Sequence, residues 1–413
     1  MCACSAITWR AGDVRSRPPV SDHFDGKRFF NPGLPPGSLP RFRDAFRMMR
    51  SDRAEWPRWV SNTATPQLPA QLTDDEIALT FINHATFLIQ IRDLNVLTDP
   101  VWSDRVSPVS WLGPKRVRAP GVRFEDLPRI DLIVISHNHY DHLDVNTLKR
   151  LETAFSPTIL VPLGDKALLT SIGCKDVVEL DWWDAVDVGP GTRVWFTPTQ
   201  HQSNRGLFDR QHSLWGSYMM TAGSRRVYFS GDAGYSPHFA EIKKRLGAPD
   251  VALLGIGAYE PRWFMKAIHM NPAEAVAAHR DLEAKQSVGM HYGTFQLSAE
   301  AIDQPWQDAT AAMAAAGLAQ NEFIRMREGE TRIYRGDPPQ SGMPGVADTN
   351  VFNRADTLDT RVGISDRKGD PMNVAAPRVR ESDRPAARAP ATDPLTYIDE
   401  HQFAPGQVKL RTV

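Results

Sequence analysis

One short segment, residues 136–144, constrains this chain more tightly than any other stretch: it reads Ser-His-Asn-His-Tyr-Asp-His-Leu-Asp. Three histidines and an aspartate fall within six positions, as H-x-H-x-D-H. The preceding run, Ile130–Ile135, is short, apolar and rich in β-branched residues, as expected of a buried strand. Because strand side chains alternate between two faces, His137 and His139 should project to one side.

The residue types of this segment are those that bind transition metals. Neutral imidazoles and a carboxylate suit zinc, manganese or iron(II), and four donors on so short a loop indicate two ions. Asp141 and His142, on the turn after the strand, can reach a second point a few ångströms from the first. Histidine and aspartate also cap helices and fill polar turns, but that role accounts for only one or two of the four.

Further donors are expected downstream, because two ions about 3.5–4 Å apart need roughly three protein donors each and a bridge. His201, Asp232 and His291 each follow a strand-like run. We predict that the first ion is held by His137, His139 and His201. We predict that the second ion is held by Asp141, His142 and His291, with Asp232 bridging the pair.

Two other polar residues also end or interrupt apolar runs. Asp99, in NVLTDPVW, either holds a ligand histidine through its second ring nitrogen or is a turn residue before Pro100. His84, in FINHATFLIQI, is more typical of a hydrogen-bonded buried histidine than of a metal donor.

Composition narrows the class of protein. A hydrophobic content of 41% and 11 tryptophans in 413 residues indicate a globular core, and a net charge of −1 argues against a nucleic-acid partner. The cysteines (Cys2, Cys4 and Cys174) are odd in number and form no disulfide framework, so we expect a reducing, cytoplasmic location. We expect neither a transmembrane helix nor a secretory signal, because no apolar run is long enough.

Three regions differ in composition. Residues 1–75 are rich in Pro, Arg and Gly and should form an irregular extension; within it, 41–59 can form an amphipathic helix, which either lies on anionic lipid or packs on the protein's own core. Residues 336–413 lack apolar periodicity, and we predict a disordered tail. Between them, strands and helices alternate in residues 76–335.

This central region should form two mixed sheets packed face to face, with helices outside and a site along the sheet edges. Strands are expected at 77–82, 86–91, 95–98, 132–136, 158–161, 193–197, 217–221, 226–230, 251–255 and 287–290. Helices are expected at 146–153, 272–282 and 309–316.

The donor series resembles the metallo-β-lactamase superfamily across residues 76–335, which implies a four-layer αβ/βα sandwich with a dinuclear metal site at the sheet edges. Within it, the chain resembles the N-acylphosphatidylethanolamine-hydrolysing phospholipase D family. The matching strings include HATFLIQI (84–91), LTDPVWSDRVSP (97–108), SHNHYDHLD (136–144), GAYEPRWFMKAIHMNPAEAV (257–276) and HYGTF (291–295). The string at 257–276 is long and specific, whereas the bare metal motif would not identify the family.

The resemblance implies two Zn²⁺ at the seven donors, with Mn²⁺ or Fe²⁺ as alternatives. Asp141 and Asp232 would then be catalytic as well as metal-binding, and His269 would lie near the substrate phosphate. The alternative for His269 is a surface histidine before a helix that starts at Asn271-Pro272.

The expected function is a zinc-dependent phosphodiesterase that hydrolyses N-acylphosphatidylethanolamine-like glycerophospholipids by means of a metal-bridging hydroxide. The alternatives are a lactonase or another ester hydrolase of the same superfamily and, less favoured, a nuclease. The expected partner is a phospholipid or small-molecule ester. Peripheral membrane contact and a homodimer are both compatible with the sequence.

Overall fold

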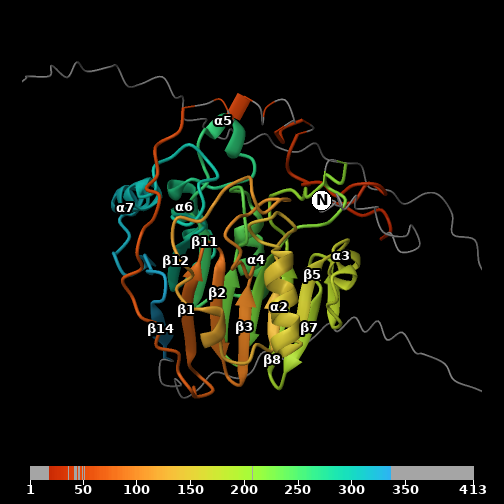
Figure 1. Cartoon of the computed structure of the whole chain (residues 1–413), viewed down its shortest axis with the longest axis vertical. Helices are drawn as coiled ribbons and strands as arrows, with labels where there is room; N and C mark the ends of the chain where they lie inside the picture. Colours follow the sequence, from red (N-terminus) through yellow and green to blue (C-terminus); the bar gives the residue numbers. More distant parts are fainter. Residues whose placement is uncertain are drawn as a thin grey trace, which may run out of the picture. The chain divides into compact units, whose positions relative to one another are not determined.

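The strands of the described residues form two mixed sheets of seven strands each (Figure 1). The computed structural model describes residues 18–335 apart from 36, 41–43, 45–46, 49, 51 and 207, all of which fall within the unit Met1–Met343. The first sheet has the order β14 (Thr331–Tyr334), β1 (Ile77–Asn83), β2 (Thr86–Ile91), β3 (Leu94–Thr98), β4 (Leu132–Val134), β5 (Thr158–Pro162) and β6 (Val177–Leu180). The second has the order β13 (Phe323–Ile324), β12 (Gln286–Met290), β11 (Val251–Gly255), β10 (Arg225–Phe229), β9 (Ser217–Ala222), β8 (Thr192–Thr197) and β7 (Ala185–Gly189).

Both sheets pair their strands in the same way. In the first, the pairs from β14 to β3 are antiparallel and those from β3 to β6 are parallel. In the second, the pairs from β7 to β10 are antiparallel and those from β10 to β13 are parallel. The carboxyl ends of the parallel strands therefore meet at one edge of each sheet.

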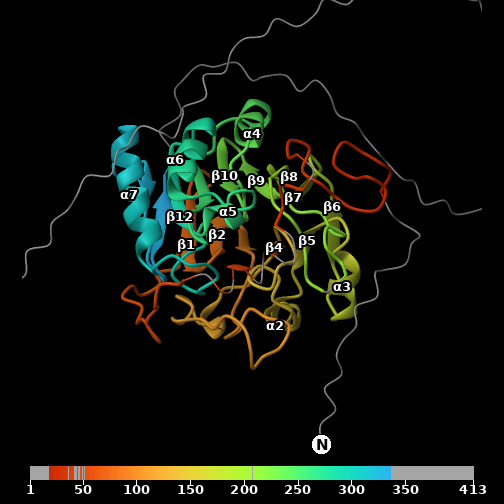
Figure 2. The same ribbon diagram turned by 90° about the horizontal axis from the view of Figure 1, so that it is seen from above.

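Helices cover the outer faces of the two sheets (Figure 2). Apolar side chains of α2 (Val145–Phe155) and α3 (Lys166–Ser171) pack against the first sheet. Those of α4 (His238–Leu246), α6 (Pro272–Asp281) and α7 (Gln304–Ala316) pack against the second. Two elements are short, the 3₁₀ turn Phe124–Asp126 and α5 (Arg262–Met265). No helix among the described residues has the length and apolarity needed to cross a bilayer.

The central strands are apolar on both faces because each face meets a different core. In β10, Val227 and Phe229 point between the sheets, whereas Tyr228 points toward the helices. In β4, Val134 faces the other sheet and Ile133 faces α2. This alternation produces three apolar layers between four structural layers. The predicted αβ/βα sandwich is confirmed.

The predicted strands are confirmed to within two residues at each end. Two of the elements that sequence did not predict, β6 and β7, lie at sheet edges and are only half-buried, so their apolar pattern is weak. The strands β13 and β14 were also not predicted, because β13 has only two residues and β14 is mostly polar. The helices α3, α4 and α5 were not predicted either.

Two predictions concern regions that are described only in part. The tail at 336–413 lies outside the described residues. The helix predicted at 41–59 is also partly outside them: Asp44, Arg47 and Met48 are helical, but 52–59 are irregular, so the prediction extends too far. Met48 is buried against Met265 and Ile268, which favours packing on the protein's own core.

Candidate metal centre

The histidine-rich loop follows β4 and is held at both ends. We expected His137 and His139 to continue the alternation of the strand, but β4 ends at Val134 and both residues lie on the loop. The backbone amides of His142 and Leu143 donate to the His139 carbonyl, at 3.1 and 2.8 Å, and close the loop. Asp144 then caps α2 by accepting from two backbone amides of its first turn. The loop thus positions its donors by turn formation and helix capping.

The first set of donor atoms unites the predicted ligands of the first ion. His139 Nδ1 lies 2.8 Å from His137 Nε2 and 3.3 Å from His201 Nε2. Asp232 Oδ2 lies 3.7 Å from both His137 Nε2 and His201 Nε2. One donor atom from each of these four residues lies within 4.8 Å of the others.

The second set unites the predicted ligands of the second ion. His142 Nε2 lies 3.1 Å from His291 Nε2. Asp141 Oδ2 lies 3.4 Å from His142 Nε2 and 3.3 Å from His291 Nε2. His291 directly follows β12 and has a left-handed backbone conformation, with φ of 64°.

Asp232 faces both sets. Its Oδ2 lies 3.1 Å from His142 Nε2, in addition to its contacts with the first set, and its Oδ1 lies 3.0 Å from His291 Nε2. The residue before it, Gly231, has φ of 54°, and a Cβ there would lie 2.5 Å from the Ser136 Cβ. A glycine is therefore required for β10 to bring Asp232 this close to the histidine loop.

The facing donor atoms lie 2.8 to 3.7 Å apart, which is near the spacing of metal ligands. Four donors at metal–ligand distances of about 2.0–2.2 Å in a tetrahedron lie about 3.3–3.6 Å from one another. The imidazole nitrogens of His137 and His139, at 2.8 Å, and of His142 and His291, at 3.1 Å, would repel through their lone pairs unless a proton or cation lay between them. Nitrogen and carboxylate donors without thiolate suit Zn²⁺, Mn²⁺ or Fe²⁺. The residues thus fit divalent metal ions.

Asp99 lies behind both sets. Its Oδ2 accepts from His142 Nδ1 at 2.6 Å and from Ser136 Oγ at 2.6 Å. Because the Ser136 hydroxyl donates to Asp99, its oxygen accepts a hydrogen bond from His137 Nδ1 at 2.9 Å. One carboxylate therefore orients a histidine of each set, directly for His142 and through Ser136 for His137. This geometry favours the ligand-holding role over that of a simple turn residue.

His84 is placed beside the second set, which sequence did not predict. Its Nε2 donates to Asp141 Oδ2 at 3.0 Å, and its carbonyl accepts from the His291 amide at 2.9 Å. It occupies the tight turn between β1 and β2 with φ of 48°. Burial lowers its pKa to about 3, so the ring is neutral and Nε2 carries the proton. A histidine in a turn that favours Gly or Asn is the signal that could have indicated this role.

His269 lies beside Asp232, and its ring centroid is 5.2 Å from that of His201 and 5.4 Å from that of His291. Its Nδ1 is 3.8 Å from Asp232 Oδ2, and only 12% of its side chain is exposed. The alternative of a surface histidine is therefore wrong. Burial lowers its pKa to about 4, so the ring is neutral at neutral pH. Helix α6 does begin at Pro272, as predicted, with Asn271 as its cap.

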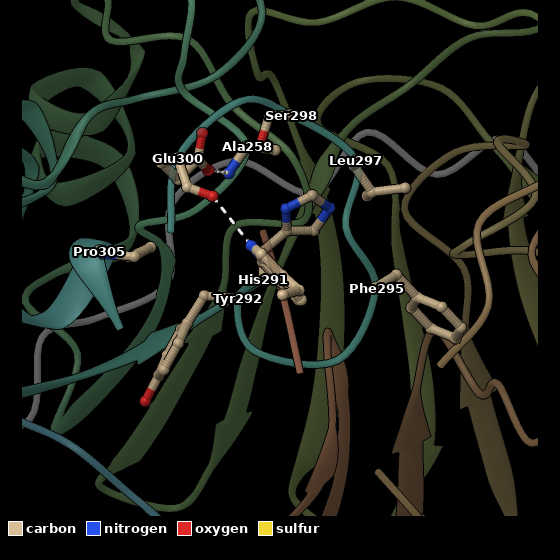
Figure 3. A pocket seen from close by; sticks show the side chains of 9 residues that line it. Ala258, His291, Tyr292, Phe295, Leu297, Ser298, Glu300 and Pro305 are labelled. Atoms are coloured by element: carbon tan, nitrogen blue, oxygen red, sulfur yellow. Dashed lines mark hydrogen bonds between the residues drawn. The ribbon is translucent and has the colours of Figure 1, made fainter. Parts of the chain in front are cut away.

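The segment that leads to His269 is held by Glu300. This buried carboxylate accepts from the backbone amide of Ala258 at 2.6 Å (Figure 3). It also accepts from the backbone amide of Glu260 at 3.1 Å. Glu300 also lines a small pocket beside His291, with a volume of about 10 Å³, roughly the room of one water. The pocket has no room for an organic substrate, which must reach the donors from another side.

The open side of the centre is marked by partial exposure. His137, His142, His201 and His291 are almost fully buried. Asp141 has 13% of its side chain exposed, and His139 and His269 are also partly exposed. A substrate can therefore approach the side formed by His139, Asp141 and His269.

The charges of the centre are unequally distributed. Burial holds the pKa values of His137 and His201 well below the usual range, so both rings are neutral. Burial also opposes charge on His291, but the carboxylates of Asp232 and Asp141 outweigh it and raise its pKa to about 9. Without metal, protonated imidazoles thus balance the carboxylates, and a divalent cation would displace those protons.

Comparison of the sequence with known proteins shows which family this chain belongs to. Residues 94–292 match the family model of the beta-lactamase superfamily domain. The chain is 39% identical over 286 residues to N-acyl-phosphatidylethanolamine-hydrolyzing phospholipase D 1 of Caenorhabditis elegans, a match that covers 66% of this chain and 80% of that protein. It is 40% identical over 218 residues to the mitochondrial N-acyl-phosphatidylethanolamine-hydrolyzing phospholipase D of Saccharomyces cerevisiae, covering 51% of this chain and 46% of that protein.

A solved structure supports the fold. A metallo hydrolase from the archaeon Ignicoccus hospitalis superposes with a TM-score of 0.50 at 23% identity, covering 63% of this chain and all of that one. The chain belongs to the metallo-β-lactamase superfamily of metal-dependent hydrolases and, within it, to the N-acylphosphatidylethanolamine-hydrolysing phospholipase D family.

Proposed function

We propose that this protein is a zinc-dependent phosphodiesterase of phospholipase D type. It would hydrolyse N-acylphosphatidylethanolamine-like glycerophospholipids and release phosphatidic acid from an N-acylated amine head group. The observation that carries the proposal is the position of Asp232, whose two oxygens face both donor sets. The names of the worm and yeast relatives support the lipid substrate.

The seven predicted donors would hold two ions. Two divalent cations held there would supply hydroxide at neutral pH and would neutralise charge on the phosphate oxygens. The remaining work falls to the protein: Asp99 and Ser136 orient His142 and His137, and His84 orients Asp141. His269, beside the shared carboxylate and on the open side, can donate a hydrogen bond to a phosphate oxygen.

The substrate proposal is tested with the purified full chain, depleted of metal and reloaded with zinc. We expect the zinc-loaded protein to release phosphatidic acid from N-acylphosphatidylethanolamine and the metal-depleted protein to do so only at background rate. In ¹⁸O-labelled water the label should enter phosphatidic acid, because water oxygen attacks phosphorus. Mass spectrometry measures both. Hydrolysis of a lactone panel without lipid turnover would favour the lactonase alternative.

The role of Asp99 leads to a second prediction. Asp99→Asn removes the carboxylate that orients a histidine of each set, so the affinity for both ions should fall by roughly 10–100-fold. Ser136→Ala should weaken only the ion held by His137. Zinc titration against a competing chelator measures both affinities, with the exposed Asp126→Asn as control. Unchanged affinities in Asp99→Asn would contradict the proposed role.

His269 is expected to act on the substrate and not on the metals. In His269→Ala, turnover of the lipid should fall by roughly 10²–10³-fold, as for loss of a donor that stabilises developing charge. Bound zinc, measured by elemental analysis, should stay at the parent level. His279→Ala is the control, since this buried histidine of α6 bonds to Ser287 and not to the centre. Full activity in His269→Ala would remove the residue from the site.

Exposed apolar side chains support peripheral membrane contact. Trp111, Phe208 and Trp263 are 71%, 88% and 49% exposed. They lie on segments that follow β3, β8 and β11, the strands that lead to Asp99, His201 and the segment with His269. Tryptophan and phenylalanine at such positions are suited to the lipid–water interface. A cytoplasmic location and a homodimer stay predictions.

Membrane contact is tested by replacing Trp111 and Phe208 together with serine. Binding to vesicles of phosphatidylcholine and phosphatidylglycerol, measured by cosedimentation, should fall several-fold because the inserted apolar area is lost. Ile333→Ser is the matched control: Ile333 is 42% exposed on β14, outside the segments around the centre. Equal vesicle binding by the double variant and the parent would argue against this surface.

A further inference from the structure

The segment from residue 18 to residue 31 is anchored to the body of the protein at several points. Phe24 and Phe29 are 3% and 2% exposed and belong to the core between the sheets. His23 Nε2 lies 2.7 Å from Asp181 Oδ1. The Phe29 amide donates to the Gln211 carbonyl at 2.9 Å, on the loop that follows His201. This part of the predicted irregular extension is therefore built into the domain.

The last residue of the segment, Asn31, holds the main chain of His201. Its Nδ2 donates to the His201 carbonyl at 2.7 Å, and its Oδ1 accepts from the His201 amide at 3.1 Å. Asn31 Oδ1 also accepts from Trp215 Nε1 at 3.1 Å. Asn31 is 7% exposed and His201 is fully buried, so water does not replace these bonds.

The ring of His201 is held by a different hydrogen bond from those that Asn31 makes with its main chain. His201 Nδ1 donates to the Ile268 carbonyl at 2.8 Å, which leaves Nε2 with its lone pair toward the first donor set. That bond sets the tautomer and the ring plane, whereas the position of Nε2 also depends on the Cα from which the ring extends. The two bonds from Asn31 restrain that Cα on both sides.

We propose that Asn31 is a positioning residue for the first ion: it fixes the main chain of His201 and so keeps Nε2 within the set formed with His137, His139 and Asp232. The proposal rests on the proposed metal centre. It also gives the N-terminal segment a role at the centre, since Asn31 is 170 positions from His201 in sequence.

Two substitutions separate this role from simple anchoring of the segment. Asn31→Ala removes all three hydrogen bonds. Asn31→Asp retains the oxygen that accepts from His201 and Trp215 but cannot donate to the His201 carbonyl. Asn62→Ala is the matched control, because Asn62 donates to the Ala119 carbonyl at 2.9 Å and not to a residue of either donor set.

The test is zinc titration of the full chain against a competing chelator. Asn31→Ala should lose about 10–100-fold in affinity for one ion and retain the other. Asn31→Asp should weaken the same ion, because its second carboxylate oxygen would face the His201 carbonyl, and Asn62→Ala should match the parent. Combining Asn31→Ala with His291→Ala, which leaves the first site, should weaken the remaining ion. Combining it with His137→Ala, which leaves the second site, should not.

Each outcome decides the inference. Parent-like affinity for both ions in Asn31→Ala would overturn it, as would equal weakening of both sites, which indicates a general structural effect. Thermal denaturation of the metal-free protein shows whether Asn31→Ala folds. If it does not, Asn31→Asp is used to compare the affinities of the two sites. A parent protein that binds no zinc would overturn the metal centre itself, and a parent that binds zinc without lipid turnover would overturn only the proposed substrate.

Discussion

The contact on which the site depends is the buried carboxylate of Asp232 between imidazoles from separate segments. A carboxylate that is 3% exposed is costly unless its charge is compensated. Here the compensation comes from protonated histidines when metal is absent and from cations when it is present. The surrounding features serve this arrangement: Gly231 permits the close approach, Asp99 orients two histidines, and Asn31 restrains His201.

The matching strand order of the two sheets explains why the donors converge. β3 and β10 occupy the same place in their sheets, where pairing changes from antiparallel to parallel, and Asp99 and Asp232 follow them. β4 and β11 occupy the next place, and the histidine loop and the segment with His269 follow them. The carboxyl ends of parallel strands point to one edge, so a site at this change of direction draws residues from both halves.

Much of the fold could be predicted from sequence because its central strands are apolar on both faces and therefore stand out as continuous runs. The half-buried edge strands β6 and β7 could not, since their pattern resembles that of loops. Within the site, the donors that follow strands were predicted as a group and lie together. His84 was predicted only as a hydrogen-bonded buried histidine, and Asn31 was not predicted to take part. Each contacts the centre through a partner distant in sequence, Asp141 for His84 and His201 for Asn31.

The sequence by itself determined the chemistry: a local run of His and Asp, with donors at the ends of later strands, specifies which atoms can bind metal, since ligand type is a property of the side chain. Only the tertiary structure decided how those atoms face one another and what holds them. The distances around Asp232, the shared support from Asp99 and the hold of Asn31 on His201 depend on packing two sheets together. Such contacts join residues that are far apart along the chain, so no short sequence pattern indicates them.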